Sequence, residues 1–396
     1  MKALRFERSL PRFAAARIAS SLGSGSGAQY GPLHLDNIEE PALPGPDWVR
    51  VRPRLAGICG SDLATVQGRS SRYFEPIVSF PFTLGHEVVA DTPDDVRVVL
   101  EPVLGCVARG IFPVCHPCAT GELGRCERIA FGCLKPGLQS GFCADTGGAW
   151  STSMVAHPSQ IHRVPDALSD DDAVMVEPAA CAIHAALSPG TLDGAVAAVI
   201  GSGTLGLLTI SALCTWNRPE HLIAAAKHPE QQTAARRLGA TQVVQPDEIA
   251  RAVRRTTGSL AIGDGDLERL TGGAHVVFDC VGSPASITDA LRIVRPGGRI
   301  VLVGMAGITK VDLTSLWHRE VSLVGAYAYG VEPMLAGRRT FDAAIELVER
   351  RQLGMLVSAR YPLQRYNDAI AHAAAAGRRG AVKVVFDLRT EKERFR

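Results

Sequence analysis

The sequence has no uninterrupted apolar stretch of the about 18 residues that a helix needs to cross a bilayer. Its most apolar stretch, AVAAVIG at 195–201, is short and ends in glycine. The chain also lacks a strong charge of either sign: its formal net charge is only +2, without the basic excess of a nucleic-acid binder. We therefore expect a soluble protein that binds neither a membrane nor nucleic acid.

A secretory apolar segment is also missing near the N-terminus, so the cytoplasm is the compartment that we expect by default. The first residues, MKALRFERSLPRFAAARIASSLGSGSG, are rich in Arg, Ala and Ser and superficially suit an organellar transit peptide. We prefer a first strand over KALRFE followed by a surface excursion. Ten cysteines in a chain of this length favour metal binding or buried thiols over a disulfide framework.

The chain is long, and its two halves differ in the pattern of their apolar residues. Its 396 residues are more than one core typically organises, so we expect two domains. The first half is rich in Pro and Gly and carries short alternating apolar runs such as WVRVRPRLAG, which predict a mostly antiparallel β domain. From about Glu177 the apolar runs no longer alternate and are separated by helical segments, which predicts parallel strands joined by crossover helices.

A glycine motif marks a candidate dinucleotide site. Gly201, Gly203 and Gly206 form G-x-G-x-x-G directly after an apolar strand and open an apolar helix. The first glycine permits a tight turn, the second lets the backbone approach a pyrophosphate, and the third lets helix and strand pack closely. Because the N–H groups of a helix N-terminus bind phosphate, Thr204 and Leu205 are included in the expected site. The alternative is a glycine-rich turn of any α/β domain.

The next strand bears on the choice of cofactor. A carboxylate about 20 residues beyond the glycine motif would bind the ribose 2′-hydroxyl of NAD. The sequence has Ala226 at this place, followed by Lys227 and His228. With no acid to repel a 2′-phosphate and a cation beside the position, NADP is favoured over NAD. The alternative is that Lys227 is a solvated loop lysine.

Two short motifs in the β-rich half, GICGSD and GHE, contain residue types that bind zinc. Cys59 and His86 would supply two ligands, and a catalytic zinc takes three protein ligands and keeps one position open. The third ligand must be a carboxylate or another thiolate, and Glu87 and Glu177 are both candidates. Asp62 could orient His86 through its other ring nitrogen.

These motifs, a cysteine cluster and the later segments VEPAACAIHA, VIGSGTLG, FDCVGS and RPGGRIVLVG occur in this order along essentially the whole chain. Together they resemble the zinc-dependent medium-chain dehydrogenase/reductase family, nearest its polyol and threonine dehydrogenase branch. The resemblance implies an α/β fold. A GroES-like β-rich catalytic domain, 1–178 with 323–396 returning to it, would be joined to a Rossmann domain with a doubly wound parallel sheet, 179–322.

The resemblance also implies an NAD(P)-dependent zinc alcohol dehydrogenase that moves hydride between the nicotinamide and an alcohol or carbonyl substrate. Carried over residue by residue, it makes Cys59 and His86 zinc ligands, with Glu177 as the third and Glu87 as the alternate. Zinc would lower the pKa of the substrate hydroxyl. Ser61 matches the residue that accepts the alcohol proton. Relatives are dimers or tetramers, so we expect a homodimer or homotetramer.

Some positions depart from the family pattern or are less specific. Ala64 stands where many relatives carry a histidine that passes the proton on, so the outlet of the proton relay is open. Lys383 matches a basic residue that can reach the cofactor pyrophosphate, although a lone lysine near a strand is more often a surface charge. Glu177 and the altered relay hint at a secondary alcohol or a sugar-like polyol as substrate.

The cysteine run VCHPCATGELGRC resembles the structural zinc lobe of the same family, which has the pattern C-x2-C-x2-C-x7-C. Cys115, Cys118 and Cys126 match the last three positions, whereas the first falls on Phe112. Cys106 lies at the point where the lobe should begin, and a short insertion, VARGIFPV, separates it from Cys115. We expect Cys106 to complete a structural zinc site of four thiolates, which leaves no position for substrate.

Two other functions compete with this interpretation. A zinc-free NADPH-dependent quinone or enoyl reductase has the same fold but lacks the Cys, His and Glu set. A non-catalytic nucleotide-binding protein would not need the metal ligands, Ser61 and the glycine motif together. The residues therefore favour the zinc enzyme over both alternatives.

Overall fold

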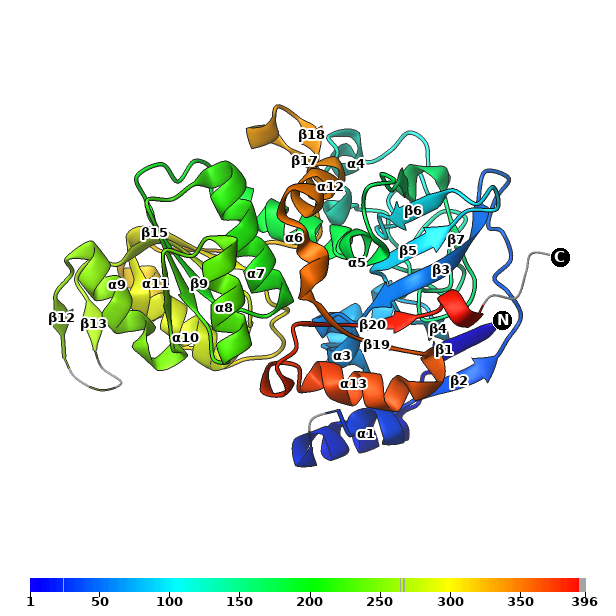
Figure 1. The fold of residues 1–396 in the computed structure, drawn as a ribbon, viewed down its shortest axis with the longest axis horizontal. Coiled ribbons are helices and arrows are strands. Elements are labelled where there is room, and N and C mark those ends of the chain that lie inside the picture. The colour runs from blue at the N-terminus through cyan, green and yellow to red at the C-terminus, as the bar shows by residue number, and fades with distance from the viewer. Residues whose placement is uncertain (24, 264, 266–267, 392–396) are drawn as a thin grey trace. The chain divides into compact units, whose positions relative to one another are not determined.

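The computed structural model describes residues 1–23, 25–263, 265 and 268–391. The chain divides into two compact units (Figure 1): unit 1 holds Met1–Glu177 and the C-terminal part from Ala344, and unit 2 holds Pro178–Ala343. The first boundary lies beside the expected one. Unit 2 extends to Ala343, beyond the expected 322, and strand β16 (Ser322–Gly325) pairs within its sheet.

Unit 1 is rich in mostly antiparallel strands. Its larger sheet has the order β19-β20-β3-β5-β6-β8, with β7 paired to β3 outside this path, and a smaller sheet has the order β2-β1-β4. The strands are β1 (Lys2–Phe6), β2 (Leu33–Asn37), β3 (Val49–Gly57), β4 (Phe82–Thr83), β5 (Val88–Asp91), β6 (Arg97–Leu100), β7 (Met154–Ala156), β8 (Ile161–Arg163), β19 (Val357–Tyr361) and β20 (Lys383–Asp387). Strand β1 confirms the first strand expected over KALRFE.

The helices of unit 1 lie between these strands. They are α1 (Leu10–Leu22), α2 (Gly27–Tyr30), α3 (Gly60–Val66), α4 (His116–Ala119), α5 (Asp170–Ala173) and α13 (Tyr366–Ala374). Two further helices, α6 (Val176–Leu187) and α12 (Thr340–Arg351), contain the unit boundaries. Much of the expected surface excursion after the first strand is thus helix α1. Among the described residues, no helix is long and apolar enough to span a membrane.

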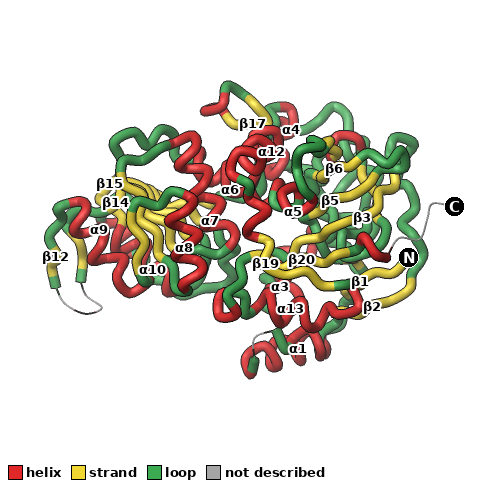
Figure 2. The backbone as a smooth tube through the Cα atoms, viewed as in Figure 1, coloured by secondary structure: helices red, strands yellow, loops and turns green. Residues whose placement is uncertain are grey.

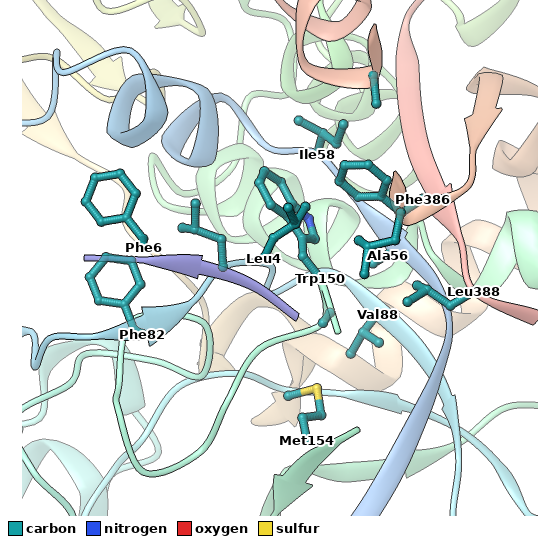
Figure 3. Packing of buried hydrophobic residues seen from close by; sticks show 14 of the residues in the cluster. Leu4, Phe6, Ala56, Ile58, Phe82, Val88, Trp150, Met154, Phe386 and Leu388 are labelled. Carbon is teal, nitrogen blue, oxygen red and sulfur yellow. The ribbon is translucent and has the colours of Figure 1, made fainter. Parts of the chain in front are cut away.

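The core of unit 1 fixes the end of strand β3, from which the candidate metal site begins. Trp150 is fully buried and packs edge-on against Phe386 at 5.1 Å between ring centroids (Figure 3). Its indole N–H donates to the carbonyl of Gly57, the last residue of β3, at 3.0 Å. Cys59 follows two residues later, so its backbone leaves a rigid, well-packed strand end.

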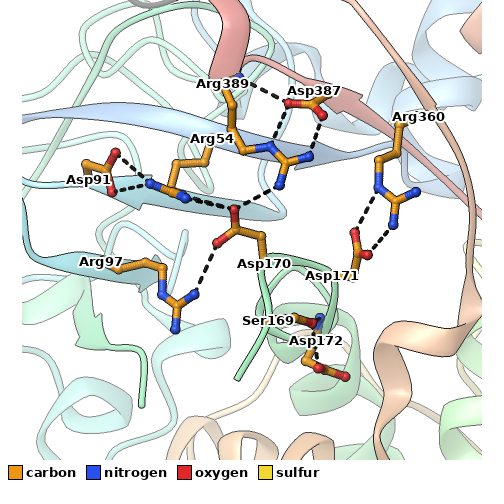
Figure 4. Close-up of polar contacts among 10 residues, drawn as sticks. All are labelled: Arg54, Asp91, Arg97, Ser169, Asp170, Asp171, Asp172, Arg360, Asp387 and Arg389. Carbon is orange, nitrogen blue, oxygen red and sulfur yellow. Dashed lines mark hydrogen bonds and ion pairs between the residues drawn. The ribbon is translucent and has the colours of Figure 1, made fainter. Parts of the chain in front are cut away.

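A network of ion pairs ties distant segments of unit 1 together (Figure 4). The buried carboxylate of Asp170, in the first turn of α5, lies 3.0 Å from Arg54 and 3.3 Å from both Arg97 and Arg389. Arg54 also binds Asp91 at 3.1 Å. Strands β3, β5 and β6, helix α5 and the C-terminal segment therefore share one polar centre.

Unit 2 contains a parallel sheet with the order β11-β10-β9-β14-β15-β16. In chain order this is the 3-2-1-4-5-6 arrangement of dinucleotide-binding domains. The strands of unit 2, with two small hairpins, are β9 (Val196–Ile200), β10 (His221–Ala225), β11 (Gln242–Val244), β12 (Ala261–Ile262), β13 (Arg269–Leu270), β14 (Ala274–Asp279), β15 (Val294–Leu302), β16 (Ser322–Gly325), β17 (Val331–Glu332) and β18 (Arg338–Arg339). The Rossmann-type sheet expected from the non-alternating apolar runs is confirmed.

Helices accompany this sheet (Figure 2). They are α7 (Thr204–Ala212), α8 (Pro229–Leu238), α9 (Ile249–Thr257), α10 (Pro284–Ile293) and α11 (Thr314–His318). Apolar side chains of α9 and α10 join one buried cluster with strands β9, β10, β14 and β15. The sheet is therefore held rigidly behind the loop that carries the glycine motif.

Candidate active site and metal centres

The glycine motif lies where the sequence predicted it, between β9 and α7. Gly201 directly follows β9 and has φ +89°, a conformation that residues with a side chain rarely adopt. A Cβ on Gly206 would lie 1.8 Å from the carbonyl oxygen of Gly201, so helix and strand approach too closely for any other residue. Gly203 is exposed and opens α7, so its backbone is free to approach a phosphate. Thr204 and Leu205 are the first residues of this helix.

This loop also lies at the switch point of the sheet. Strand β9 is flanked by β10 on one side and by β14 on the other, so the chain leaves the carboxyl end of β9 where the strand order reverses. Crevices at such points bind nucleotides in open α/β sheets. The position of the glycine motif in unit 2 thus fits a dinucleotide.

The residues expected to choose between NAD and NADP follow strand β10. Ala226 is buried, and its N–H bonds to the carbonyl of Val244 at 2.9 Å. Lys227 is exposed, and His228 precedes the first residue of helix α8. The sequence has no carboxylate at this place. The expected NADP preference depends on this missing acid and on the neighbouring lysine, and it stays a prediction.

In unit 1, one atom each of Cys59, His86 and Glu87 lie within 4.8 Å of one another. Cys59 is half-buried and precedes helix α3, whereas His86 and Glu87 are 4% and 1% exposed. Gly85 has φ +97°, and a Cβ there would lie 2.4 Å from the ring of Trp150, so glycine is needed where the chain turns into His86. Thiolate, imidazole and carboxylate are ligands that zinc accepts, and three of them leave a coordination position open. The donor set therefore fits a catalytic zinc.

The structure bears on the expected order of the two glutamates. The resemblance implied Glu177 as the third ligand and Glu87 as the alternate, and the structure groups Glu87 with Cys59 and His86. Ligation by Glu177 stays a prediction. Residues 84–87 lie between strands β4 and β5 and outside a regular strand, so the side chains of His86 and Glu87 need not point to opposite faces. Glu177 is buried in the first turn of α6.

Asp62 takes the orienting position that the sequence predicted. One carboxylate oxygen, Oδ2, accepts the backbone N–H of Cys59 at 3.0 Å, and Oδ1 lies 3.4 Å from Nδ1 of His86. Burial by itself lowers the pKa of His86, but the facing charge of Asp62 outweighs it and raises this pKa well above its usual range. Because Nδ1 faces the carboxylate, Nε2 is left for a metal.

Lys383 has a different environment from the one expected. Its ammonium is 2% exposed, forms an ion pair with Glu87 and lies 3.3 Å from the carbonyl of Ile58. Burial lowers the pKa of Lys383, but the charges of Glu87 and Cys59 outweigh this effect and raise it. A contact with the cofactor pyrophosphate stays a prediction that these contacts do not support.

Sequence reasoning missed this buried pair. The two partners lie 296 residues apart, so no local pattern joins them. The sequence did contain a sign that Lys383 is buried, because this lysine begins an apolar strand, KVVFD, whose residues are buried on both faces. A lysine in such a strand needs a buried anion.

Ser61 lies in the first turn of α3, beside the metal group, and is partly exposed. Its carbonyl accepts the hydroxyl of Thr65 at 2.9 Å, and that hydroxyl also contacts Ser70 at 2.9 Å. Ala64, at the place of the family's relay histidine, is 9% exposed. The Thr65 hydroxyl is thus held by the backbone of Ser61, and the outlet of the proton relay stays open.

The four cysteines of the second candidate site are also close together. The sulfurs of Cys106, Cys115, Cys118 and Cys126 all lie within 4.8 Å of one another. Phe112, at the position of the family's first cysteine, is 72% exposed. Cys106 therefore completes the group, as the spacing analysis expected.

Hydrogen bonds around these sulfurs suit bound thiolates. The N–H of Cys115 points to the sulfur of Cys106 and the N–H of Arg128 to that of Cys126, both at 3.4 Å. Burial raises the pKa of Cys115, but N–H groups of Glu127 and Cys118 outweigh it and lower this pKa to about 7. Burial raises the pKa of Cys126 to about 11 and also raises the pKa of Cys118, so these two thiols need a bound metal to become thiolates. Four thiolates fit zinc and close its coordination shell, which is the pattern of a structural site.

Comparison with known proteins agrees with this arrangement. Residues 45–166 match the alcohol dehydrogenase GroES-like domain, and residues 204–350 match the zinc-binding dehydrogenase family. L-idonate 5-dehydrogenase of Vitis vinifera is 26% identical over 358 residues, which cover 87% of this chain and 89% of that protein. Sorbitol dehydrogenase of Arabidopsis thaliana is 27% identical over 362 residues, with the same two coverages.

A solved structure shares the fold. The 2R,3R-butanediol dehydrogenase of Bacillus subtilis is 22% identical and has a TM-score of 0.68, over 98% of this chain and 99% of that one. A GroES-like unit with a metal group and a Rossmann unit with a dinucleotide loop define a zinc-binding dehydrogenase. The chain belongs to the zinc-dependent medium-chain dehydrogenase/reductase family, and it is an oxidoreductase of the alcohol dehydrogenase class.

Proposed function

We propose that the chain interconverts a secondary alcohol or sugar-like polyol and its carbonyl compound, with hydride passing to or from NADP. The observation that carries this proposal is the buried group of Cys59, His86 and Glu87, which offers three zinc ligands of three kinds. The relatives named above are an L-idonate and a sorbitol dehydrogenase, which supports a polyol as substrate.

Zinc in this group supplies a Lewis acid that lowers the pKa of a substrate hydroxyl. Asp62 holds His86 through Nδ1, which fixes the ring orientation. Ser61, in the same helical turn as Asp62, is positioned to accept the alcohol proton. Gly203 and the first turn of α7 bind the pyrophosphate through backbone N–H groups.

A screen of primary, secondary and polyhydroxy alcohols with both cofactors, with and without a chelator, tests the reaction. We expect oxidation of a secondary or polyhydroxy alcohol that the chelator abolishes. Cys59→Ala should remove one zinc per chain and the activity, whereas Cys133→Ala, at an exposed free cysteine of the same unit, should keep both. The proposal would be contradicted if Cys59→Ala kept full activity, or if the zinc-loaded protein oxidised no alcohol of the screen. Reduction of an enone by the metal-free protein would favour the quinone reductase alternative.

The choice between the two glutamates is testable by metal analysis. We assign the third ligand to Glu87 because it lies within the group, and keep Glu177 as the alternate. Glu87→Gln should weaken zinc binding about 10-fold or more, which is the low end of what altered metal-site contacts cost. Glu177→Gln is the matched control. Stronger zinc loss from Glu177→Gln would reverse the assignment.

The NADP preference rests on the missing acid and on Lys227. Lys227→Ala should lower kcat/KM for NADPH while leaving that for NADH unchanged, because only the former carries a 2′-phosphate. Arg237→Ala, in the last turn of helix α8, which begins two residues after Lys227, controls for the loss of a positive charge in this region. Equal or better use of NADH by the unaltered protein would end this assignment.

The four cysteines Cys106, Cys115, Cys118 and Cys126 are proposed to hold a structural zinc. Cys118→Ser should release one zinc and lower stability while the catalytic zinc remains. Ten cysteines in a chain of this length favour metal binding or reduced thiols over a disulfide framework, which supports the reducing cytoplasm as the compartment of action. We further propose a homodimer or homotetramer, for which the exposed edge strand β16 is the candidate surface.

A further inference from the structure

Arg109 is fully buried in the insertion that separates Cys106 from Cys115, and the proposed reaction makes no use of it. Burial lowers the pKa of Arg109 because the cation loses its hydration. In the part of the chain that the structure describes, no carboxylate lies within ion-pair distance of its guanidinium. A buried cation in this position needs another kind of partner.

Backbone carbonyls supply that partner. The guanidinium donates hydrogen bonds to the carbonyl oxygens of Leu104 (3.0 Å), Phe131 (3.0 Å), Leu134 (3.2 Å), Lys135 (3.2 Å) and Gly137 (2.5 Å). The first precedes Cys106 by two residues, and the others belong to residues 131–137. One side chain therefore joins the segment that carries Cys106 to a second loop.

The backbone of Arg109 makes the same connection. Its N–H donates to the carbonyls of Gly105 at 3.2 Å and Cys106 at 3.1 Å, which closes the turn at Cys106. Its carbonyl accepts the N–H of Cys133 at 3.0 Å. A Cβ on Gly132 would lie 2.3 Å from that carbonyl oxygen, so the approach of the second loop depends on glycine.

We propose that Arg109 is a positioning residue of the four-cysteine metal site. Its guanidinium and backbone hold the turn that presents Cys106 to the other three sulfurs. The inference rests on the proposed structural zinc. It explains how a ligand displaced nine residues upstream of Cys115, instead of three, still reaches the metal.

Zinc release from the holoprotein to a chromogenic chelator tests this role, with the cobalt-substituted protein as a spectroscopic probe of thiolate ligation. Arg109→Met and Arg109→Lys should both release the structural zinc about 10-fold faster or more, because altered contacts around a metal site typically have this effect. Lysine keeps the charge but lacks the planar fork of donors. The cobalt spectra of both variants should show weaker thiolate bands.

Arg125→Met is the matched control, because Arg125 lies in the same lobe but is exposed in an ion pair with Glu122. It should release zinc at the unaltered rate. If Arg109→Met does not fold, Arg109→Lys carries the test. Unaltered release and cobalt spectra in Arg109→Lys would overturn the proposal. If Cys118→Ser keeps all of its zinc, the structural site itself fails, which is a separate outcome.

A double-mutant cycle tests whether Arg109 acts through Cys106. Cys106→Ser leaves three sulfur ligands, and its zinc should already be released quickly. Adding Arg109→Lys to Cys106→Ser should then change the release rate less than about 2-fold, because the two residues serve one interaction. Additive effects of the two substitutions would show that Arg109 stabilises the lobe independently of Cys106, and would overturn the positioning role.

Discussion

Glu87 has two candidate partners, the Lys383 ammonium and the proposed zinc. Lys383→Met should leave a buried carboxylate without its cation, and breaking such a pair costs about 3–5 kcal/mol. We expect a smaller loss with zinc present, because the metal takes over part of the carboxylate charge. Thermal unfolding of the protein with zinc and after chelation measures the difference.

Lys2→Met is the control for this prediction. Lys2 forms an ion pair with Glu391, but its side chain is 48% exposed, so its removal should cost less than about 1 kcal/mol. An equal effect of Lys383→Met in the zinc-loaded and metal-free protein would mean that Glu87 does not share its charge with a metal.

A second residue predicts a pH dependence in unit 2. Nδ1 of His275 accepts the N–H of Val196 at 3.0 Å, and burial, with the positive charge of Arg295, lowers the pKa of His275 below 6.5. A pKa that is lower in the folded state gives stability that is complete above pH 6.5 and is lost as the pH falls through the folded value. We expect the unfolding temperature to fall in this acidic range, and less steeply in His275→Asn.

The exposed His318, in the same unit, provides the control. His318→Asn should keep the pH profile of the unaltered protein. If His275→Asn loses stability on acidification as steeply as the unaltered protein does, protonation of His275 is not the cause.

Single residues differ in how far the sequence could predict them. Cys106 was found because its distance from the other cysteines could be compared with a known spacing. The pair of Glu87 and Lys383 could not be found, because only folding brings the two together. The grouping of Glu87 with Cys59 and His86 could not be predicted for a related reason: the resemblance assigns a residue type to a position but does not give the local path of the backbone.

At the scale of elements, Asp170 joins helix α5 to strands β3 and β6 and to the C-terminal segment of unit 1. Asp170→Asn keeps the shape but removes the charge that Arg54, Arg97 and Arg389 share, so we expect a loss of about 1.5–3 kcal/mol, as for charge-assisted hydrogen bonds. Denaturant unfolding followed by a probe in unit 1 measures it.

Asp171→Asn is the matched control, since Asp171 lies in the same helical turn and pairs with Arg360 in a more exposed place. Its loss should stay within about 1 kcal/mol. Similar losses in both variants would point to the helix terminus, rather than the arginine cluster, as the source of the effect.

Elements with a strong pattern were predictable. Strand β9, the glycine turn and helix α7 follow from an apolar run, a motif with known backbone demands and a second apolar run. Helix α1 was not predicted as a helix, because Leu10, Ile18 and Leu22 are exposed and its buried contacts are made mainly by small residues such as Ala16 and Ala19. Alanines are weak markers of a buried helix face in a sequence, so the buried side of α1 was not evident from its pattern.

At the scale of the molecule, the apolar residues change their pattern near Glu177, which marked the first unit boundary. The composition did not locate the second boundary, after Ala343. Strand β16 lies in the apolar run VSLVGAY, which the sequence indicates as the last Rossmann strand, yet the expected boundary at 322 falls inside this strand. Its pairing with β15 decides to which unit it belongs, and pairing depends on the fold.

The exposed edge of β16 leads to a prediction about assembly. Among the described strands, β16 pairs on one side only, with β15, and Leu323 and Val324 are 37% and 36% exposed. Trp317 and Tyr327, just before and after this strand, are 79% and 50% exposed. An apolar edge strand of this kind is a surface for pairing with another chain, and a second copy can pair with it about a two-fold axis.

We therefore expect a dimer or tetramer in solution that Leu323→Lys combined with Val324→Lys converts to smaller species, because charges on an edge strand oppose pairing. Light scattering after size-exclusion chromatography measures the mass, and circular dichroism checks that the fold is kept. Leu260→Lys, at a 70% exposed position elsewhere in unit 2, should leave the assembly intact. A monomeric unaltered protein, or a double variant of unchanged mass, would show that β16 is not the interface.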